Sequence, residues 1–186
     1  ADCEGTIYFE TNKPYRVAPE LGVTAGNESR KIAVIIDNEY RMGNGELSSL
    51  QSGALQDFVD ELEYDGCDYS LALITHDDED AVEVLPFALN NGAAFVAAVN
   101  GLSTTADADP VTVETHRRSD TAMELAEGYT WGASTNMVIL LSGGAPGDTS
   151  PPEEGGPEEL AQYAATDALL IQGVATHTIS VDYGGA

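Results

Sequence analysis

The stretch KIAVIIDNEYRMGNGELSSL, residues 31–50, decides the predicted fold. A strand is predicted over residues 31–37, because residues 32–36 form a continuous apolar run before Asp37, as expected for a strand covered on both faces of a sheet. A helix is predicted over residues 46–64, because its apolar residues recur on one helical face: Leu47, Leu50, Ala54, Leu55, Phe58, Val59 and Leu62. A buried strand, a loop and an amphipathic helix in this order indicate an α/β domain.

The rest of the chain continues this alternation. Further strands are predicted at residues 5–10, 69–75, 82–87, 137–142 and 174–182, and further helices at 91–102, 119–131 and 157–171. Pro86 suits a strand at the edge of a sheet. The pattern predicts a doubly wound, mainly parallel sheet with helices on both faces over residues 31–186. Residues 1–30 are predicted to form an N-terminal strand and an irregular arm.

The composition excludes some classes of function. The chain has 186 residues, and its 32 acidic residues against 7 basic ones give a formal charge of −25. A nucleic-acid partner is excluded, because phosphates require a basic surface. No apolar run reaches the roughly 18 residues that span a membrane. Acid enrichment with only two lysines is typical of proteins soluble in high salt, and an acidic secreted protein from ordinary water fits equally well.

Several features favour export. A chain that begins ADCEG fits a mature protein whose signal peptide was cleaved after a small residue. Cys3 and Cys67 are compatible with one disulfide in an oxidising compartment, the alternative being two free thiols. Asn27 begins an Asn-Glu-Ser sequon and is a glycosylation candidate. We therefore expect an extracellular or cell-surface protein.

Four stretches together resemble the von Willebrand factor type A (vWA) domain family. They are IAVIID with its following helix, RRSDTAMELA (117–126), NMVILLSGGAPGD (136–148) and VATHTISVDYG (174–184). Their order and spacing are similar to those of the family over residues 31–184. The resemblance implies a Rossmann-like vWA fold.

The resemblance also implies a place for a divalent cation, which the family binds through Asp-x-Ser-x-Ser, a threonine and a second aspartate. Asp37 matches the first aspartate, whereas Glu39 and Arg41 stand where the serines belong. Ser119 stands in for the threonine, and Gly143 replaces the second aspartate. Hard cations need several oxygens, so no metal is expected. If calcium or magnesium does bind, the candidate ligands are Asp37, Glu39 and Ser119. Otherwise Arg41 is placed to neutralise Asp37 by an ion pair.

Other polar clusters give weaker signals. Residues 76–80, His-Asp-Asp-Glu-Asp, concentrate carboxylates but match no known calcium loop, which favours a solvated acidic turn. His177 lies in an alternating strand, where a structural role is expected. His116 precedes Arg117 and Arg118, whose simplest role is local charge balance, the alternative being an anion site. No nucleophile elbow, phosphate loop or His-Glu-x-x-His motif occurs. The sequence therefore predicts no catalytic residue.

The amino end provides a candidate assembly strand. A domain similar to this family continues after residues 174–184 with a helix and an edge strand, whereas this sequence ends at Ala186. The segment Gly5, Thr6, Ile7, Tyr8 and Phe9 is similar to that edge strand. It could pair with its own sheet, with the sheet of the next subunit, or lie elsewhere on its own domain. Pairing with the next subunit would build a head-to-tail filament.

The cysteines bear on this choice. Cys67 directly precedes a strand in one half of the predicted sheet, and the added strand would lie in the other half. A disulfide needs Cα atoms within about 7 Å. A Cys3–Cys67 bridge within one chain therefore conflicts with pairing of the arm to its own sheet, whereas a bridge between subunits does not.

The sequence predicts two alternative functions. The first is a secreted, non-catalytic structural or adhesive subunit that binds its own copies or another extracellular protein. The alternative is a monomeric, cation-dependent adhesion module that binds an acidic ligand.

Overall fold

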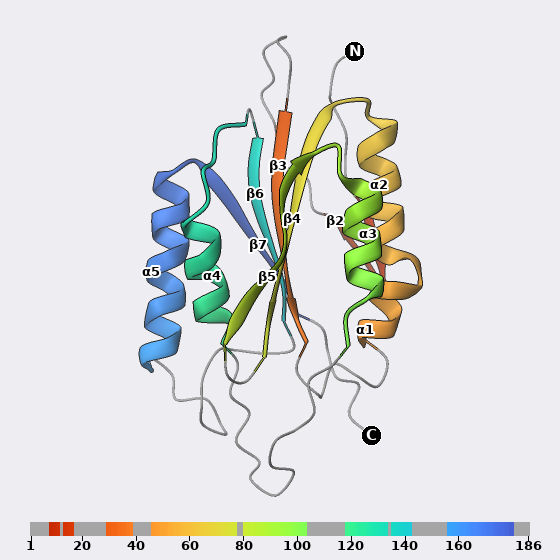
Figure 1. Cartoon of the computed structure of the whole chain (residues 1–186). Coiled ribbons are helices and arrows are strands. Elements are labelled where there is room, and N and C mark those ends of the chain that lie inside the picture. Colours follow the sequence, from red (N-terminus) through yellow and green to blue (C-terminus); the bar gives the residue numbers. More distant parts are fainter. Residues whose placement is uncertain are drawn as a thin grey trace, which may run out of the picture.

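The computed structural model describes residues 8–11, 13–16, 29–38, 46–77, 80–103, 118–133, 135–142 and 156–180. Within them, one five-stranded sheet has the order β5-β4-β3-β6-β7 (Figure 1). Its strands are β3 (Ser29–Asp37), β4 (Asp68–His76), β5 (Ala81–Leu89), β6 (Thr135–Ser142) and β7 (Val174–Ser180). The pairs β3–β4, β3–β6 and β6–β7 are parallel, and β5 runs antiparallel to β4. The predicted doubly wound, mainly parallel sheet is confirmed.

Helices cover both faces of the sheet, as Figure 1 shows. On one face lie α1 (Glu46–Ser49), α2 (Leu55–Tyr64) and α3 (Gly92–Asn100). On the other lie α4 (Ser119–Glu127) and α5 (Pro157–Ile171). No helix in the described ranges is long and apolar enough to cross a membrane.

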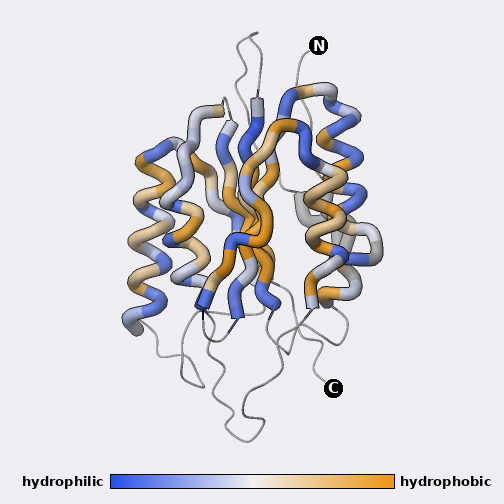
Figure 2. The backbone as a smooth tube through the Cα atoms, in the orientation of Figure 1, coloured by the Kyte–Doolittle hydropathy of each residue, from blue (hydrophilic) through white to orange (hydrophobic). Residues whose placement is uncertain are grey.

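Side chains that alternate along the strands build two apolar cores. Ile32 and Val34 of β3 face the α1–α3 side, where Phe58 of α2 meets Phe95 of α3 edge to face at a centroid distance of 6.5 Å. The residues of the core under α4 and α5 include Ala33, Ile35, Ala72, Ile74, Ala122, Met123, Val138, Leu140, Ala165 and Leu169. Figure 2 shows the corresponding apolar colouring along the inner strands. Burial on both faces explains the continuous apolar runs of the sequence.

The helix predicted over residues 46–64 is interrupted. A wide π-type turn, η2 (Leu50–Ala54), separates α1 from α2. Inside it Gly53 adopts φ 155° and ψ −31°, a conformation that side-chain-bearing residues rarely take. The apolar spacing continues across this kink, which is why the pattern alone predicted one helix.

The helix predicted over residues 119–131 ends earlier, at Glu127. Gly128 follows it, and glycine is the residue that most often terminates a helix. The indole N–H of Trp131 donates to the carbonyl oxygen of Ala126 at 3.1 Å and so satisfies one of the last helical carbonyls. The aromatic residues after Gly128 therefore pack as a loop and not as a helical turn.

The amino-terminal segment forms a small sheet of its own. β1 (Tyr8–Thr11) and β2 (Lys13–Arg16) pair antiparallel, with Tyr8 opposite Arg16 and Phe9 opposite Tyr15. A strand was predicted at residues 5–10 and an irregular arm after it, so β2 was missed. Pro14 is tolerated because a two-stranded sheet consists of edges. Neither strand joins the five-stranded sheet within the described residues, which corrects the option of pairing with the chain's own sheet.

Candidate functional site

The carboxyl ends of β3, β4 and β6 bring three polar side chains into one row. Asp37 ends β3 and pairs in register with His76, the last residue of β4. Ser142 follows Leu141, the partner of Ile36, and so lies on the other side of Asp37. By alternation all three continue the face covered by α4 and α5. Asp37, His76 and Ser142 are only 0%, 1% and 3% exposed, so their polar groups must be compensated inside the protein.

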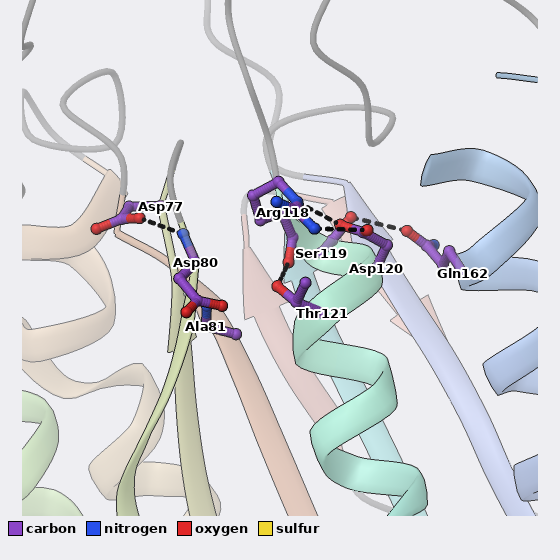
Figure 3. Close-up of polar contacts among 8 residues, drawn as sticks. All are labelled: Asp77, Asp80, Ala81, Arg118, Ser119, Asp120, Thr121 and Gln162. Carbon is purple, nitrogen blue, oxygen red and sulfur yellow. Dashed lines mark hydrogen bonds and ion pairs between the residues drawn. The ribbon is translucent and has the colours of Figure 1, made fainter. Parts of the chain in front are cut away.

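The start of α4 places a charge pair at the same edge (Figure 3). Arg118 donates from Nε to Oδ1 of Asp120 at 3.1 Å and from Nη2 to Oδ2 at 3.2 Å. The Asp120 side chain is 5% exposed and that of Arg118 34%. The hydrogen bond to Asp120 raises the pKa of Arg118 against the lowering effect of burial, and the charges of Asp120, Asp80 and Glu158 raise it further. Arg118 is thus a permanent cation bound by the Asp120 carboxylate.

The same residues connect neighbouring elements. The backbone N–H of Arg118 donates to the carbonyl oxygen of Asp77 at 3.1 Å, which ties α4 to the loop after β4. In that loop the N–H of Asp80 donates to Oδ1 of Asp77 at 3.1 Å. The Ser119 hydroxyl donates to Oε1 of Gln162 on α5 at 2.7 Å (Figure 3). A hydrogen-bonded strip therefore runs from β4 through α4 to α5.

The described residues at this edge do not suit a divalent cation. The short bond to Gln162 turns the Ser119 hydroxyl toward α5. The guanidinium of Arg118 already binds both carboxylate oxygens of Asp120. In the part of the chain that the structure describes, no group of three or more His, Cys, Asp or Glu residues is arranged to hold a metal. A hard cation needs several free oxygens and no fixed positive charge beside it.

The structure places Asp37, which matches the family's first aspartate, and Ser119, which stands in for its threonine, at this same edge and buries both. Glu39, Arg41 and Gly143 lie outside the described residues, so the ion pair between Arg41 and Asp37 stays a prediction.

Two members of the site, Asp120 and Gln162, were not predicted. The carboxyl ends of the strands at Asp37, His76 and Ser142 were expected to lie at one edge, as they do. Arg118 was expected to balance local charge, and it does so with Asp120, two residues away. Gln162 meets Ser119 only through the packing of α5 against α4, for which no local sequence signal exists. Asp78, Glu79, His116 and Arg117 lie outside the described residues.

The free edge of β7 is a second candidate site. β7 pairs with β6 without interruption from Val174 to Ser180, and no described strand pairs with its other edge. Its sequence, VATHTIS, contains no Asp, Glu, Lys, Arg or Pro. Oγ1 of Thr176 and Nε2 of His177 are buried and have no hydrogen-bond partner within the described residues. A straight, uncharged edge is a template for strand addition.

The opposite edge, β5, is irregular. Its register against β4 shifts on both sides of Leu73, and Pro86 removes one backbone donor. Val82, 60% exposed, and Glu83 also lie on this strand. Bulges, proline and charge are the devices by which proteins prevent pairing at an edge.

An aromatic cluster holds β5 to the rest of the domain. The Phe87 ring packs against Tyr129 and Trp131 at centroid distances of 4.8 and 5.3 Å. The Tyr129 hydroxyl donates to Oε2 of Glu83 at 2.5 Å, and Nζ of Lys31 lies 5.4 Å from the Phe87 ring centroid. These contacts anchor the irregular edge from the α4 side.

The remaining predicted positions are only partly described. Cys67 is 8% exposed and directly precedes β4. Cys3 and Asn27 lie outside the described residues, so the disulfide and the glycan stay predictions. Of the predicted assembly strand, Tyr8 and Phe9 belong to β1, whereas Gly5, Thr6 and Ile7 are not described.

Comparisons with known proteins identify the architecture. No protein-family model and no curated protein matches the chain. Among solved structures, the N-terminal domain of TFIIH p34 matches with a TM-score of 0.59 and 13% identity, over 83% of this chain and 81% of that one. Two structures of proximal thread matrix protein 1 from the mussel byssus match with TM-scores of 0.56 and 0.55, at 16% and 14% identity.

The mussel structures cover 83% and 82% of this chain, and this chain spans 36% of the mussel protein. At such identities the likeness shows the fold alone. The likeness agrees with the vWA-like fold that the resemblance in the sequence implied.

Proposed function

We propose that this chain is a non-catalytic structural or adhesive subunit of an extracellular assembly. In this proposal the free edge of β7 accepts an N-terminal strand from a neighbouring copy, and repetition of the contact builds a filament. The observations that carry the proposal are the uninterrupted, uncharged edge of β7 and a small hairpin that is not part of the main sheet.

The charge of the chain supports a contact through backbone groups. Two copies with a formal charge of −25 each repel one another over most of their surface. β7 carries no acidic side chain, so the strand itself adds no charge repulsion to the contact. Strand addition draws its affinity from main-chain hydrogen bonds, which a general excess of acidic side chains does not prevent.

The hairpin supports the identity of the donor. An isolated two-stranded sheet is marginally stable in water, and a third strand stabilises it. One edge of β1 pairs with β2, which leaves its other edge for a neighbour's β7. Tyr8 and Phe9, from the predicted assembly strand, lie on β1. Because the donor and acceptor surfaces differ, the contact is head-to-tail and does not close on itself.

The structural likeness to a thread matrix protein of the mussel byssus agrees with a structural role but does not extend beyond the fold. The extracellular location rests on the predicted disulfide and sequon. The alternative function, a cation-dependent monomeric adhesion module, is less well supported because Arg118 and Gln162 engage the polar groups around Ser119.

Light scattering of the native chain at several concentrations, compared with a variant lacking residues 1–12, tests the proposal. We expect concentration-dependent assemblies that a chelator does not dissolve and that the truncation removes. Non-reducing electrophoresis of the same samples shows whether Cys3 and Cys67 join one chain or two. A monomer at all concentrations, with or without the truncation, contradicts the proposal. Ligand binding by that monomer, lost with a chelator and with Asp37→Ala, would establish the adhesion module instead.

A further inference from the structure

We propose that the outward side of α5 is a self-complementary surface on which two copies of this chain pair antiparallel. This contact goes beyond the proposed strand addition, because it uses a different face of the domain and is tested separately.

The outward side of α5 is apolar. At 3.6 residues per turn it lies opposite Ala165 and Leu169, which are buried in the core under α4 and α5. In Figure 1 the helix lies at the margin of the domain, with the sheet on its other side. Exposed residues on this outward side, called the α5 stripe below, include only one charged residue. They are Leu160, Tyr163, Ala164, Asp167, Leu170 and Ile171.

The α5 stripe differs from the outward side of α2. That helix exposes a row of acidic residues, as expected for a chain with a formal charge of −25: Asp57, Asp60, Glu61 and Glu63. An acidic outward side needs no partner, because water solvates it. Leucine, isoleucine and tyrosine side chains that are more than half exposed at helical spacing form a stripe of the kind that proteins usually cover. The α5 stripe therefore marks a contact surface.

The order of residues along the α5 stripe makes it complementary to itself. In an antiparallel pair of α5 helices with a two-fold axis level with Ala165, Leu160 of each copy lies opposite Leu170 of the other. Tyr163 of each copy lies opposite Asp167 of the other, where the hydroxyl can donate a hydrogen bond to the carboxylate. In a parallel pair the two Asp167 carboxylates would instead face and repel each other. The sequence of the stripe thus favours the antiparallel pair.

The charges of α5 argue against a lipid surface as the partner. The helix contains Glu158, Glu159 and Asp167 and no lysine or arginine. Helices that lie in a membrane interface carry basic residues beside their apolar side, because many lipid headgroups are anionic. A second copy of the chain makes no such demand. Its own stripe brings one carboxylate, which meets the Tyr163 hydroxyl that donates to Oε1 of Glu159 at 2.6 Å in the single chain.

The size of the α5 stripe sets the strength of the contact. A helix of 15 residues is about 22 Å long, so one helix pair buries less than the roughly 800 Å² per partner of a standard interface. Pairing between single chains is therefore weak. In the proposed filament, on which this step alone rests, copies joined through β7 would present many stripes in a row, and multivalency would join two filaments side by side.

The test uses the full chain with Thr178→Lys, because a lysine on β7 discourages strand addition and leaves α5 unchanged. Sedimentation velocity in about 0.5 M NaCl, where charge repulsion is screened, should show monomers and dimers only. A two-fold contact closes on itself, and we expect a Kd of roughly 0.1–1 mM. Monomers alone at about 2 mM would overturn the inference. Light scattering of the unsubstituted chain reports the filament separately, so the two failures are distinguishable.

Leu170→Glu, added to that chain, should weaken the dimer at least about tenfold, because it places a charge opposite Leu160. Leu89→Glu is the matched control. Leu89 lies at the end of β5 and is 67% exposed, against 69% for Leu170. Both variants replace leucine by glutamate, so they add the same general repulsion. Equal weakening by the two variants would overturn the inference.

An exchange of charges tests the antiparallel order. Leu160→Lys/Leu170→Glu should pair at least about threefold more tightly than Leu170→Glu alone, because each lysine then faces the glutamate of the other copy. Val84→Lys/Leu170→Glu is the control with the same net charge, and it should gain nothing, since Val84 lies on β5. In a parallel pair like charges would face each other and the first double variant would be the weakest. A double variant on α5 that pairs no more tightly than the control would overturn the inference.

Discussion

The two edges of the central sheet are built differently. β5 runs antiparallel, with register shifts on both sides of Leu73, Pro86 within the strand, and the Phe87–Tyr129–Trp131 cluster against it. β7 runs parallel, keeps one register over its whole length and has no charged residue or proline. The protein thus protects one edge against pairing and leaves the other regular.

This difference bears on which edge can accept a partner strand. A chain with a charge of −25 has many acidic residues with which to block an edge, yet none lies in β7. Edge strands that must remain single usually carry lysine, proline, a bulge or an inward-pointing charge. β5 has three of the features that discourage pairing, and β7 has none, which supports β7 as the edge intended for a partner strand.

The first prediction concerns a charge placed on β7. Thr178 is exposed and lies on the free edge strand, so Thr178→Lys should leave the fold intact. A lysine at an edge discourages strand pairing, and we expect the concentration for half assembly to rise at least about tenfold, the equivalent of about 1.4 kcal/mol. Light scattering over a concentration series measures this change.

Val84→Lys is the control for that experiment. Val84 is 39% exposed on β5, so the same charge is added to an exposed position on the protected edge. Assembly should be unchanged, because β5 does not take part. If the two variants weaken assembly equally, net charge and not the β7 edge is responsible, and the comparison between the edges fails.

A second prediction concerns a substitution that disturbs the packing near β5 and leaves β7 unchanged. Gly92 begins α3 directly after β5, and a Cβ there would lie 2.5 Å from the Tyr69 hydroxyl and closer still to Cγ1 of Val59. Gly92→Ala should therefore lower the free energy of unfolding by up to about 3 kcal/mol through overpacking. Chemical denaturation measures the loss, with Gly132→Ala as control, since a Cβ at Gly132 meets nothing within 4 Å. An unchanged stability would mean that α3 is not packed closely against β4.

The fold was largely predictable from the sequence, because the central strands β3, β4 and β6 are mostly buried on both faces and read as apolar runs, as in residues 32–36 and 137–141. The kink at Gly53 was not predictable from periodicity, since apolar residues continue across it. The site was predictable only where a strand ends in a polar residue, as at Asp37. Ser119 and Gln162 are 43 residues apart and meet only through helix packing, which no local pattern encodes.

A third prediction concerns how β4 tolerates the irregular register of β5. The Asn91 side chain accepts from the backbone N–H of Leu71 at 2.9 Å and donates to its carbonyl oxygen at 2.8 Å. The Asn91 side chain thus takes the place of a β5 residue as the hydrogen-bond partner of Leu71, next to one of the register shifts. Asn91→Ala would leave two buried backbone groups without partners, and we expect a loss of about 2 kcal/mol in unfolding free energy. Amide hydrogen exchange at Leu71 should accelerate while exchange in β7 stays unchanged; equal acceleration at both edges would show that the sheet opens as one unit.

The smallest effect is expected from removal of the Tyr129 hydroxyl, which forms a hydrogen bond between the aromatic cluster and β5. Tyr129→Phe removes the hydrogen bond to Glu83 and keeps the ring contacts, so the free energy of unfolding should fall by about 1 kcal/mol.

The same hydroxyl predicts a pH dependence. Burial, followed by the hydrogen bond and the charge of Glu83, raises the pKa of Tyr129 in the folded state. The contribution of protonated Tyr129 to the free energy of unfolding is therefore fully present below the unfolded pKa of about 10. It declines as the pH rises above that value. Denaturation between pH 8 and 11 should show a steeper fall for the wild type than for Tyr129→Phe, and the remaining slope should reflect groups such as Tyr69, whose pKa is also raised by burial. Parallel curves would mean that Tyr129 does not depend on Glu83, and the anchoring of β5 would then rest on ring packing alone.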